Sequence, residues 1–175
     1  MHHPGDSDMP LAPPINLQGW IDKNRDKLKP PVGTFALYDQ GGFLVMVIGG
    51  PNSRTDYHVN PSEELFFQVQ GDIVVKVIDN GEFRDLPIKE GEMFLLPARV
   101  PHSPQRGPNT IGVVVEFPKL LDEDHHLRWF CKGCKSIVHQ ESFRPQDLGK
   151  QIKEMLTRWS GDENMRKCKG CGVVN

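Results

Sequence analysis

Six short runs of β-branched and aromatic residues lie between Thr34 and Phe117, and they constrain the fold of this 175-residue chain more than any other feature. Glycine or proline punctuates the gaps between them. Many short strands with regular turns are typical of a β-sandwich or barrel, and Asn80–Gly81 is the dipeptide that favours a two-residue hairpin. The sequence therefore predicts a mainly β protein built as a jelly-roll barrel. The predicted strands are 35–38, 43–48, 65–69, 73–78, 93–96 and 111–117.

The segments on either side of these runs have a different composition. Residues 1–14 hold four prolines and little that could be buried, so we expect a flexible N-terminus. From Asn16, a residue type that caps helices, apolar residues recur at helical spacing as far as Lys29, which predicts a short helix before the barrel. After Pro118 the chain becomes more charged, and one amphipathic helix is predicted from Leu148, Ile152, Met155, Leu156 and Trp159.

All four cysteines fall in two Cys-x-x-Cys pairs, Cys131/Cys134 and Cys168/Cys171. Two such pairs separated by a longer insertion strongly indicate a tetrahedral thiolate site of zinc-ribbon or rubredoxin type. A redox dithiol needs only one pair and is the weaker alternative. Iron and zinc both suit four thiolates, so we expect a structural Fe or Zn site. The predicted organisation is a barrel with its N-terminal helix at 15–118, followed by a small four-cysteine metal-binding unit at 119–175.

Charge and hydropathy narrow the classes of partner. The net charge is −2, which provides no overall field for gathering nucleic acid. No apolar run approaches the roughly 20 residues of a membrane helix, and the N-terminus lacks the features of a signal peptide. We expect a soluble cytoplasmic protein with no membrane or nucleic-acid partner. A nucleic-acid-binding zinc ribbon remains an alternative because basic residues surround the cysteines: Lys132, Lys135, Arg166, Lys167 and Lys169.

Two histidines and a glutamate, His58, Glu64 and His102, stand where a small barrel would turn them inward. A lone histidine is more often structural, but a two-histidine, one-carboxylate set suits ferrous iron and leaves positions open for substrate and O2. Glu64 precedes an apolar run, so burying its charge would require a partner such as a metal. Pro97 and Pro101 predict a stiffened loop that presents His102. The sequence thus predicts an Fe(II) site.

The residues around this triad form two blocks. They read G-P-N-S-R-T-D-Y-H-V-N-P-S-E-E-L-F-F-Q-V-Q-G at 50–71 and G-E-M-F-L-L-P-A-R-V-P-H-S-P-Q-R at 91–106. These blocks resemble the paired motifs of the cupin superfamily, although Asn60 stands where the usual first block has a second histidine. The loss of that possible fourth ligand favours an oxygenase. A metal-binding cupin that is an isomerase or a small-molecule binding protein is the alternative.

At a finer level, the chain resembles the 3-hydroxyanthranilate 3,4-dioxygenase family from about Asn16 onward. The resemblance rests on K-P-P-V at 29–32, R-T-D-Y-H at 54–58, P-H-S-P-Q-R at 101–106 and the paired cysteine motifs. It implies extradiol cleavage of 3-hydroxyanthranilate by O2 to 2-amino-3-carboxymuconate semialdehyde. This reaction belongs to the tryptophan/kynurenine pathway towards quinolinate and NAD. The resemblance also implies a homodimer.

The resemblance further implies residue roles. The triad would bind Fe(II), with Glu64 also contacting substrate; Arg106 and Glu116 would hold the substrate, and Arg54 would lie beside O2 and the substrate carboxylate. The chemistry of these residues agrees, because a guanidinium matches a carboxylate and a carboxylate can bind an amine or accept a hydroxyl proton. The alternatives are solvated arginines and an outward-facing Glu116. The family pattern often has asparagine where this chain has Thr34.

Five further histidines have no part in this prediction, and two of them, His2 and His3, lie in the N-terminus that is expected to be flexible. His125 and His126 lie beside the acidic residues 122–124 and are predicted to form a solvated surface cluster. His139 is left without a role.

Overall fold

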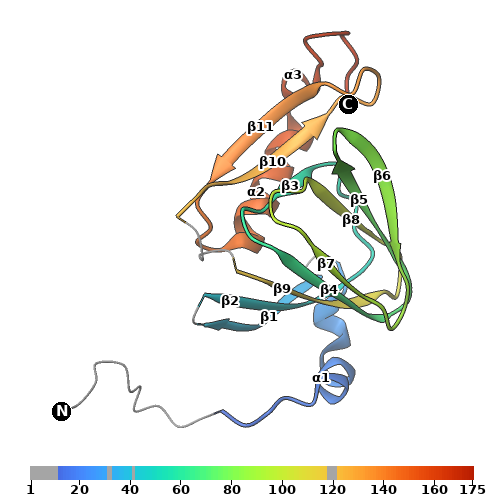
Figure 1. Cartoon of the computed structure of the whole chain (residues 1–175), viewed down its shortest axis with the longest axis vertical. Coiled ribbons are helices and arrows are strands. Elements are labelled where there is room, and N and C mark those ends of the chain that lie inside the picture. Colours follow the sequence, from blue (N-terminus) through green and yellow to red (C-terminus); the bar gives the residue numbers. More distant parts are fainter. Residues whose placement is uncertain (1–11, 31–32, 41, 118–121) are drawn as a thin grey trace, which may run out of the picture.

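Two antiparallel sheets dominate the computed structural model, which describes residues 12–30, 33–40, 42–117 and 122–175 (Figure 1). The five-stranded sheet has the order β1-β2-β9-β4-β7, and the six-stranded sheet has the order β11-β10-β3-β8-β5-β6. The predicted mainly β fold is confirmed. The strands are β1 (Thr34–Gln40), β2 (Phe43–Gly49), β3 (Tyr57–Val59), β4 (Glu64–Gln70), β5 (Ile73–Asp79), β6 (Glu82–Ile88), β7 (Met93–Leu96), β8 (His102–Arg106), β9 (Ile111–Glu116), β10 (His125–Phe130) and β11 (Ile137–Phe143).

Apolar side chains from both sheets meet inside the barrel. Strands β4 and β5 alternate buried and less buried positions, as expected where one face of a sheet covers a core. Phe66 on β4 is only 1% exposed and belongs to this cluster. The cluster consists of Leu44, Met46, Phe66, Ile73, Val75, Val77, Ile88, Leu96, Val114 and Leu148.

The β5–β6 connection is the two-residue hairpin that the sequence predicts. Asp79 pairs with Glu82, and the two residues between them, Asn80 and Gly81, have φ values of 50° and 84°. Positive φ at both central positions is the geometry that asparagine and glycine tolerate best. The prediction is confirmed.

The N-terminal helix packs on the outer face of the five-stranded sheet. Helix α1 (Leu17–Asn24) begins after Asn16, whose Oδ1 accepts a 2.7 Å hydrogen bond from the Gly19 amide, so the predicted cap is confirmed. A 3₁₀ turn, η1 (Arg25–Leu28), continues it. Ile21 and Leu28 are buried against Val47 and Ile111, two strand residues outside the barrel cluster.

The strands β10 and β11 form one edge of the six-stranded sheet, and the sequence did not indicate them. β10 is antiparallel to β3, with Leu127 opposite His58, and Figure 1 shows the β10–β11 pair above the barrel strands. His125, Leu127 and Trp129 alternate with less buried residues, but the acidic stretch before them obscured this pattern. The predicted boundary at 118–119 and residues 1–11 lie outside the described residues, and the division into units stays a prediction.

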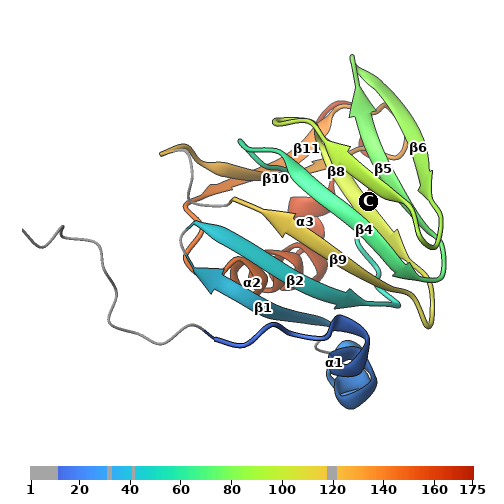
Figure 2. The ribbon, with the colours of Figure 1, turned by 60° about the horizontal axis from the view of Figure 1, so that its bottom comes forward.

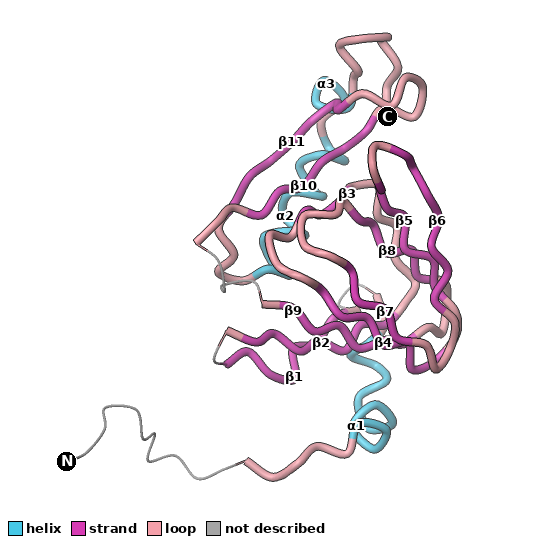
Figure 3. Tube along the Cα trace, in the orientation of Figure 1, coloured by secondary structure: helices cyan, strands magenta, loops and turns pink. Residues whose placement is uncertain are grey.

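The predicted C-terminal helix is present as α2 (Leu148–Gly161), which is followed by α3 (Glu163–Arg166). Asp147 caps α2 by accepting a 3.0 Å hydrogen bond from the Lys150 amide. Trp159 on α2 stacks on Trp129 of β10, with ring centroids 4.8 Å apart. Figures 2 and 3 show α2 running beside strands of both sheets. None of the described helices is long and apolar enough to cross a membrane.

Candidate active site

Strand pairing brings the predicted metal triad together. His58 on β3 is directly opposite His102 on β8, and Glu64 is the first residue of β4. All three side chains are buried, and each offers a donor atom within 4.8 Å of the others. His102 is part of a strand and does not lie on the stiffened loop that its flanking prolines predict. β8 pairs with β3 only at His102, so Pro104 has no partner on β3. The absence of an amide hydrogen on this proline is tolerated there.

The environment of His102 fits a bound cation. Its Nδ1 lies 3.0 Å from the carbonyl oxygen of Val100, so Nδ1 carries a hydrogen and Nε2 is the nitrogen that a metal would take. That Nε2 is 3.1 Å from Glu64 Oε2, a buried oxygen without a hydrogen-bond partner in the described part of the chain. A cation between these two atoms, either a metal ion or a proton on Nε2, would satisfy both of them. Donors about 2.1 Å from a metal and at right angles to each other lie about 3.0 Å apart, which fits an octahedral ion.

Glu64 faces a second buried carboxyl group, Glu116, across the β4–β9 pair. Burial opposes ionisation of Glu64, but nearby His102 and Arg54 lower its pKa below the ordinary value. Burial, together with the charge of Glu64, raises the pKa of Glu116 well above the ordinary value. Neighbouring groups whose pKa values are pushed apart can take different roles. Glu64 is thus suited to ligate as a carboxylate, and Glu116 to exchange a proton.

Asn60 orients Glu116. Its Nδ2 donates a 2.8 Å hydrogen bond to Glu116 Oε2, while its Oδ1 accepts from the amide and hydroxyl of Ser62, each at 3.0 Å. The Ser62 amide can only donate, so the Asn60 amide group must turn its NH2 towards Glu116. The sequence identified Asn60 only as a missing histidine; its contact with Glu116 depends on the fold.

Arg54 is held by a buried partner two residues away. Its Nε and Nη2 donate to the two carboxylate oxygens of Asp56 at 3.1 and 2.5 Å, and Asp56 is fully buried. The bidentate pair fixes the plane of the guanidinium. Arg54 is therefore not a freely solvated loop residue, and its clamp was the feature that sequence reasoning missed.

Arg106 is a second arginine near the triad, and its side chain is buried. Its side chain contacts Gln68, with Nη1 3.3 Å from Oε1, and its amide donates to Asn52. Burial lowers its pKa to about 10, so it stays charged at neutral pH. No ion pair joins it to a carboxylate among residues 12–30, 33–40, 42–117 and 122–175. A buried cation that forms no ion pair with the described residues is suited to bind an anionic ligand.

Glycine at position 112 provides the space beside this arginine. A Cβ atom at Gly112 would lie 2.7 Å from Gln68 Oε1 and 2.9 Å from Arg106 Nη1. Both contacts are closer than a carbon atom tolerates, so a side chain there would displace the guanidinium.

A cavity of about 910 Å³ joins these groups. Its walls include the triad and the three other predicted site residues, Arg54, Arg106 and Glu116, together with Thr34. One side is apolar and comes from the barrel and from α2. That side includes Leu44, Met46, Phe66, Val114, Leu148, Ile152 and Leu156. The participation of α2 could not be read from the sequence, because residue contacts between distant segments set it.

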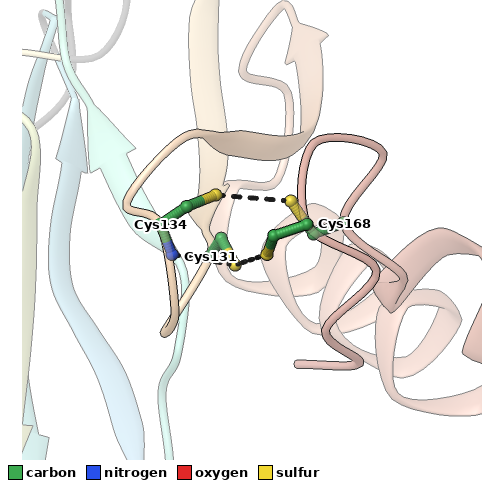
Figure 4. Close-up of side chains that lie close together, drawn as sticks. Cys131, Cys134 and Cys168 are labelled. Carbon is green, nitrogen blue, oxygen red and sulfur yellow. Dashed lines mark hydrogen bonds between the residues drawn. The ribbon is translucent and has the colours of Figure 1, made fainter.

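The four cysteines converge between the β10–β11 connection and the C-terminal loop (Figure 4). The Cys131 and Cys171 sulfurs are 3.5 Å apart, and those of Cys134 and Cys168 are 3.6 Å apart. Sulfurs roughly 2.3 Å from one tetrahedral ion lie about 3.8 Å apart, so these distances suit a shared metal.

The protonation chemistry of these thiols also favours a cation. The Ser136 hydroxyl and two backbone amides lower the pKa of Cys168 to about 6. The Val173 amide favours the Cys171 thiolate, but the adjacent cysteines raise the pKa of Cys171 to about 12. Once some thiols ionise, the others resist a further negative charge, and a metal ion removes that repulsion.

The structure places His125, His126 and His139 in different surroundings. The prediction of a solvated cluster is wrong for His125, which is fully buried with its Nδ1 3.0 Å from His58 Nε2. Its neighbour His126 points to the other side of β10 and contacts the Ser142 hydroxyl. His139 packs against Trp129 and contacts Glu141. The alternation of β10 puts His125 inside, overriding the polarity of the preceding residues.

A family model and several curated relatives of this chain name the same activity. The family model of 3-hydroxyanthranilic acid dioxygenase matches residues 9–160. The chain belongs to this family. Curated proteins named 3-hydroxyanthranilate 3,4-dioxygenase are similar over nearly their whole length. That of Meyerozyma guilliermondii is 50% identical, covering 94% of this chain and 96% of the relative. That of Candida albicans is 48% identical, covering 95% of this chain and 97% of the relative.

Solved structures also include similar proteins. A cupin-2 domain protein from Shewanella frigidimarina matches with a TM-score of 0.46 and 12% identity, covering 55% of this chain and 90% of that protein.

Replacing a triad member should remove the metal and leave the barrel folded. Glu64→Ala or His102→Ala is expected to lose iron binding and oxygen uptake, because these side chains serve the ion more than the apolar core. Metal analysis and circular dichroism of the purified variants measure both properties. Wild-type iron content with normal turnover in either variant would contradict the proposed ligand set.

The cysteine site should instead support folding. Structural thiolate sites bind metal with an apparent energy of about 10 to 16 kcal/mol, comparable with a domain's net stability of about 5 to 15 kcal/mol. Cys131→Ser is therefore expected to lower thermal stability or solubility first and activity second. A fully stable but inactive variant would point to a redox role.

Proposed function

We propose that this protein is a non-heme Fe(II) ring-cleaving dioxygenase that converts 3-hydroxyanthranilate and O2 to 2-amino-3-carboxymuconate semialdehyde. The observation that carries the proposal is the joint presence of the His58/Glu64/His102 triad and buried Arg106 on one cavity. The first suits a metal that handles O2, and the second suits the carboxylate of an aromatic acid. Family membership and the names of the similar proteins support the same reaction.

His58, Glu64 and His102 would hold the iron as three neutral or singly charged donors. Burial and the neighbouring imidazoles lower the pKa of His58 well below the ordinary value, so His58 is the neutral base that ligation needs. When bound, ferrous iron would supply positions for the substrate and O2 and the electron transfer that makes them react. Both oxygen atoms enter the product.

The arginines would orient the substrate. Arg106 would bind the carboxylate, because the cavity buries this cation without an anionic partner among the described residues. Arg54, clamped by Asp56, would lie beside O2 and the carboxylate. Holding the ring in one orientation limits which carbon atoms can react.

Glu116 would handle the proton of the substrate. Asn60 binds Oε2, and the raised pKa makes the ionised form of Glu116 a stronger base than an ordinary carboxylate. Such a group can accept the proton of the ring hydroxyl or a hydrogen bond from the amine. The apolar wall formed by Met46, Val114 and Ile152 would keep water from the reacting ring.

The proposal extends to the second metal and the assembly. We propose a structural iron or zinc ion in the four-cysteine site, a cytoplasmic location, where thiols stay reduced, and a homodimer without nucleic-acid partners. Metal analysis identifies the ion, and light scattering measures the molecular mass in solution. The function itself is tested by oxygen uptake and the absorbance change during incubation of the Fe(II) protein with 3-hydroxyanthranilate; no uptake by fully loaded protein would reject it.

Arg106→Ala tests recognition of the acid. Removing one member of a buried charge pair costs about 2 to 5 kcal/mol, or roughly thirty-fold to several-thousand-fold in affinity. We expect 3-hydroxyanthranilate to bind that much more weakly and 2-aminophenol, which lacks the carboxylate, to bind almost unchanged. Anaerobic titration of both ligands into wild-type and variant Fe(II) proteins measures this. Equal losses for the two ligands would show that Arg106 supports the site generally.

Glu116→Gln tests proton transfer. Glutamine keeps an oxygen for the Asn60 hydrogen bond but cannot take up a proton. General-base catalysis contributes about 10² to 10⁴ in rate, so kcat should fall by roughly that factor while anaerobic substrate affinity changes only a few-fold. Steady-state kinetics and anaerobic titration separate the two effects. An unchanged kcat would exclude Glu116 as the base.

A further inference from the structure

His125 faces the predicted metal ligand His58 from a neighbouring strand. The rings are nearly coplanar, at 25° to each other, with centroids 5.2 Å apart and the nitrogens His58 Nε2 and His125 Nδ1 separated by 3.0 Å. Both side chains are buried. This arrangement is a ring-to-ring hydrogen bond in the interior, where such a bond strongly restricts orientation.

His125 is not placed as a fourth ligand. Only His58, Glu64 and His102 have donor atoms mutually within 4.8 Å around this point of the described chain. His125 instead contacts the Nε2 of His58, so a metal held by the triad would take the other ring nitrogen, Nδ1. In protein metal sites, a ligating histidine commonly directs its second nitrogen to a hydrogen-bond partner, which sets its tautomer and orientation.

The hydrogen bond admits only one arrangement compatible with ligation. If His125 Nδ1 donated, His58 Nε2 would be the acceptor and the hydrogen of neutral His58 would lie on its other nitrogen, with no lone pair left for a metal. If His58 Nε2 donates, His58 Nδ1 is free to ligate and His125 Nδ1 accepts. Metal binding therefore selects the second arrangement.

We propose that His125 is a positioning residue that fixes the tautomer and ring orientation of His58 for metal binding. The inference rests on the proposed triad. It also gives β10 a function, because the strand that carries His125 runs on to Cys131 of the four-cysteine site. Phe143 of β11 packs beside the His125 ring, with centroids 5.7 Å apart, and so restricts its motion.

The position of His125 also depends on strand register. Leu127 of β10 lies opposite His58 of β3, and Phe143 of β11 lies opposite His125. A shift of β10 by one residue would turn His125 out of the core, since side chains alternate between the two faces of a sheet. The packing of Trp129 against Trp159 opposes such a shift.

Substitutions at position 125 test the proposal through iron affinity, measured by competition with a chelator. His125→Phe fills the space but removes the acceptor, and should weaken Fe(II) binding by about 10- to 100-fold. His125→Asn offers an oxygen near the position of Nδ1 and should remain within a few-fold of wild type. His126→Phe, on the opposite face of β10, is the matched control and should bind iron as wild type does.

Two further measurements separate the possible failures. Unchanged affinity in His125→Phe, alongside a large loss in His58→Ala, would overturn the role of His125 and leave the triad standing. Unchanged affinity in His58→Ala would reject the triad itself. If His125→Phe fails to fold, nitrogen NMR of wild-type protein loaded with zinc decides: a coupling between the His58 and His125 rings is expected, and its absence would overturn the proposal.

Discussion

The close approach of two buried electron-pair donors, His102 Nε2 and Glu64 Oε2, is the constraint on which the rest of the site depends. A metal ion or a proton between these atoms satisfies both of them, and both belong to buried side chains. The barrel holds them together through strand pairing, with His58 opposite His102 and Glu64 at the start of β4. The polar groups of the cavity are therefore arranged around a site for a positive charge.

Charge balance then explains the other polar groups in the cavity. Glu64 has a lowered pKa, whereas the pKa of Glu116 rises because this carboxyl group is buried and because a second negative charge beside Glu64 is unfavourable. Asp56 neutralises Arg54, whereas the guanidinium of Arg106 contacts the neutral Gln68 and forms no ion pair with a carboxylate in the described part of the chain. The interior thus keeps one proton-exchanging acid and one cation for a ligand, which are the two groups that an aromatic hydroxy acid requires.

The segment after residue 122 participates in both proposed metal sites. β10 pairs with β3, places His125 behind His58, and leads into the first cysteine pair. Helix α2 adds Leu148 to the barrel core and forms part of the cavity wall. Metal in the four-cysteine site would fix the far end of this segment, so a structural ion could support the geometry of a site that it does not touch.

The sequence by itself determined the strand-rich fold, the hairpin at Asn80–Gly81 and the chemistry of the donor sets, because local propensity and residue type carry those properties. The convergence of His58, Glu64 and His102 could be expected from motif spacing. The tertiary structure decided which polar groups meet: Asn60 with Glu116 and His125 with His58. These contacts join residues 56 and 67 positions apart, and they follow from strand register and from the alternation of faces. No local pattern in the sequence specifies either, since each depends on which strands become neighbours.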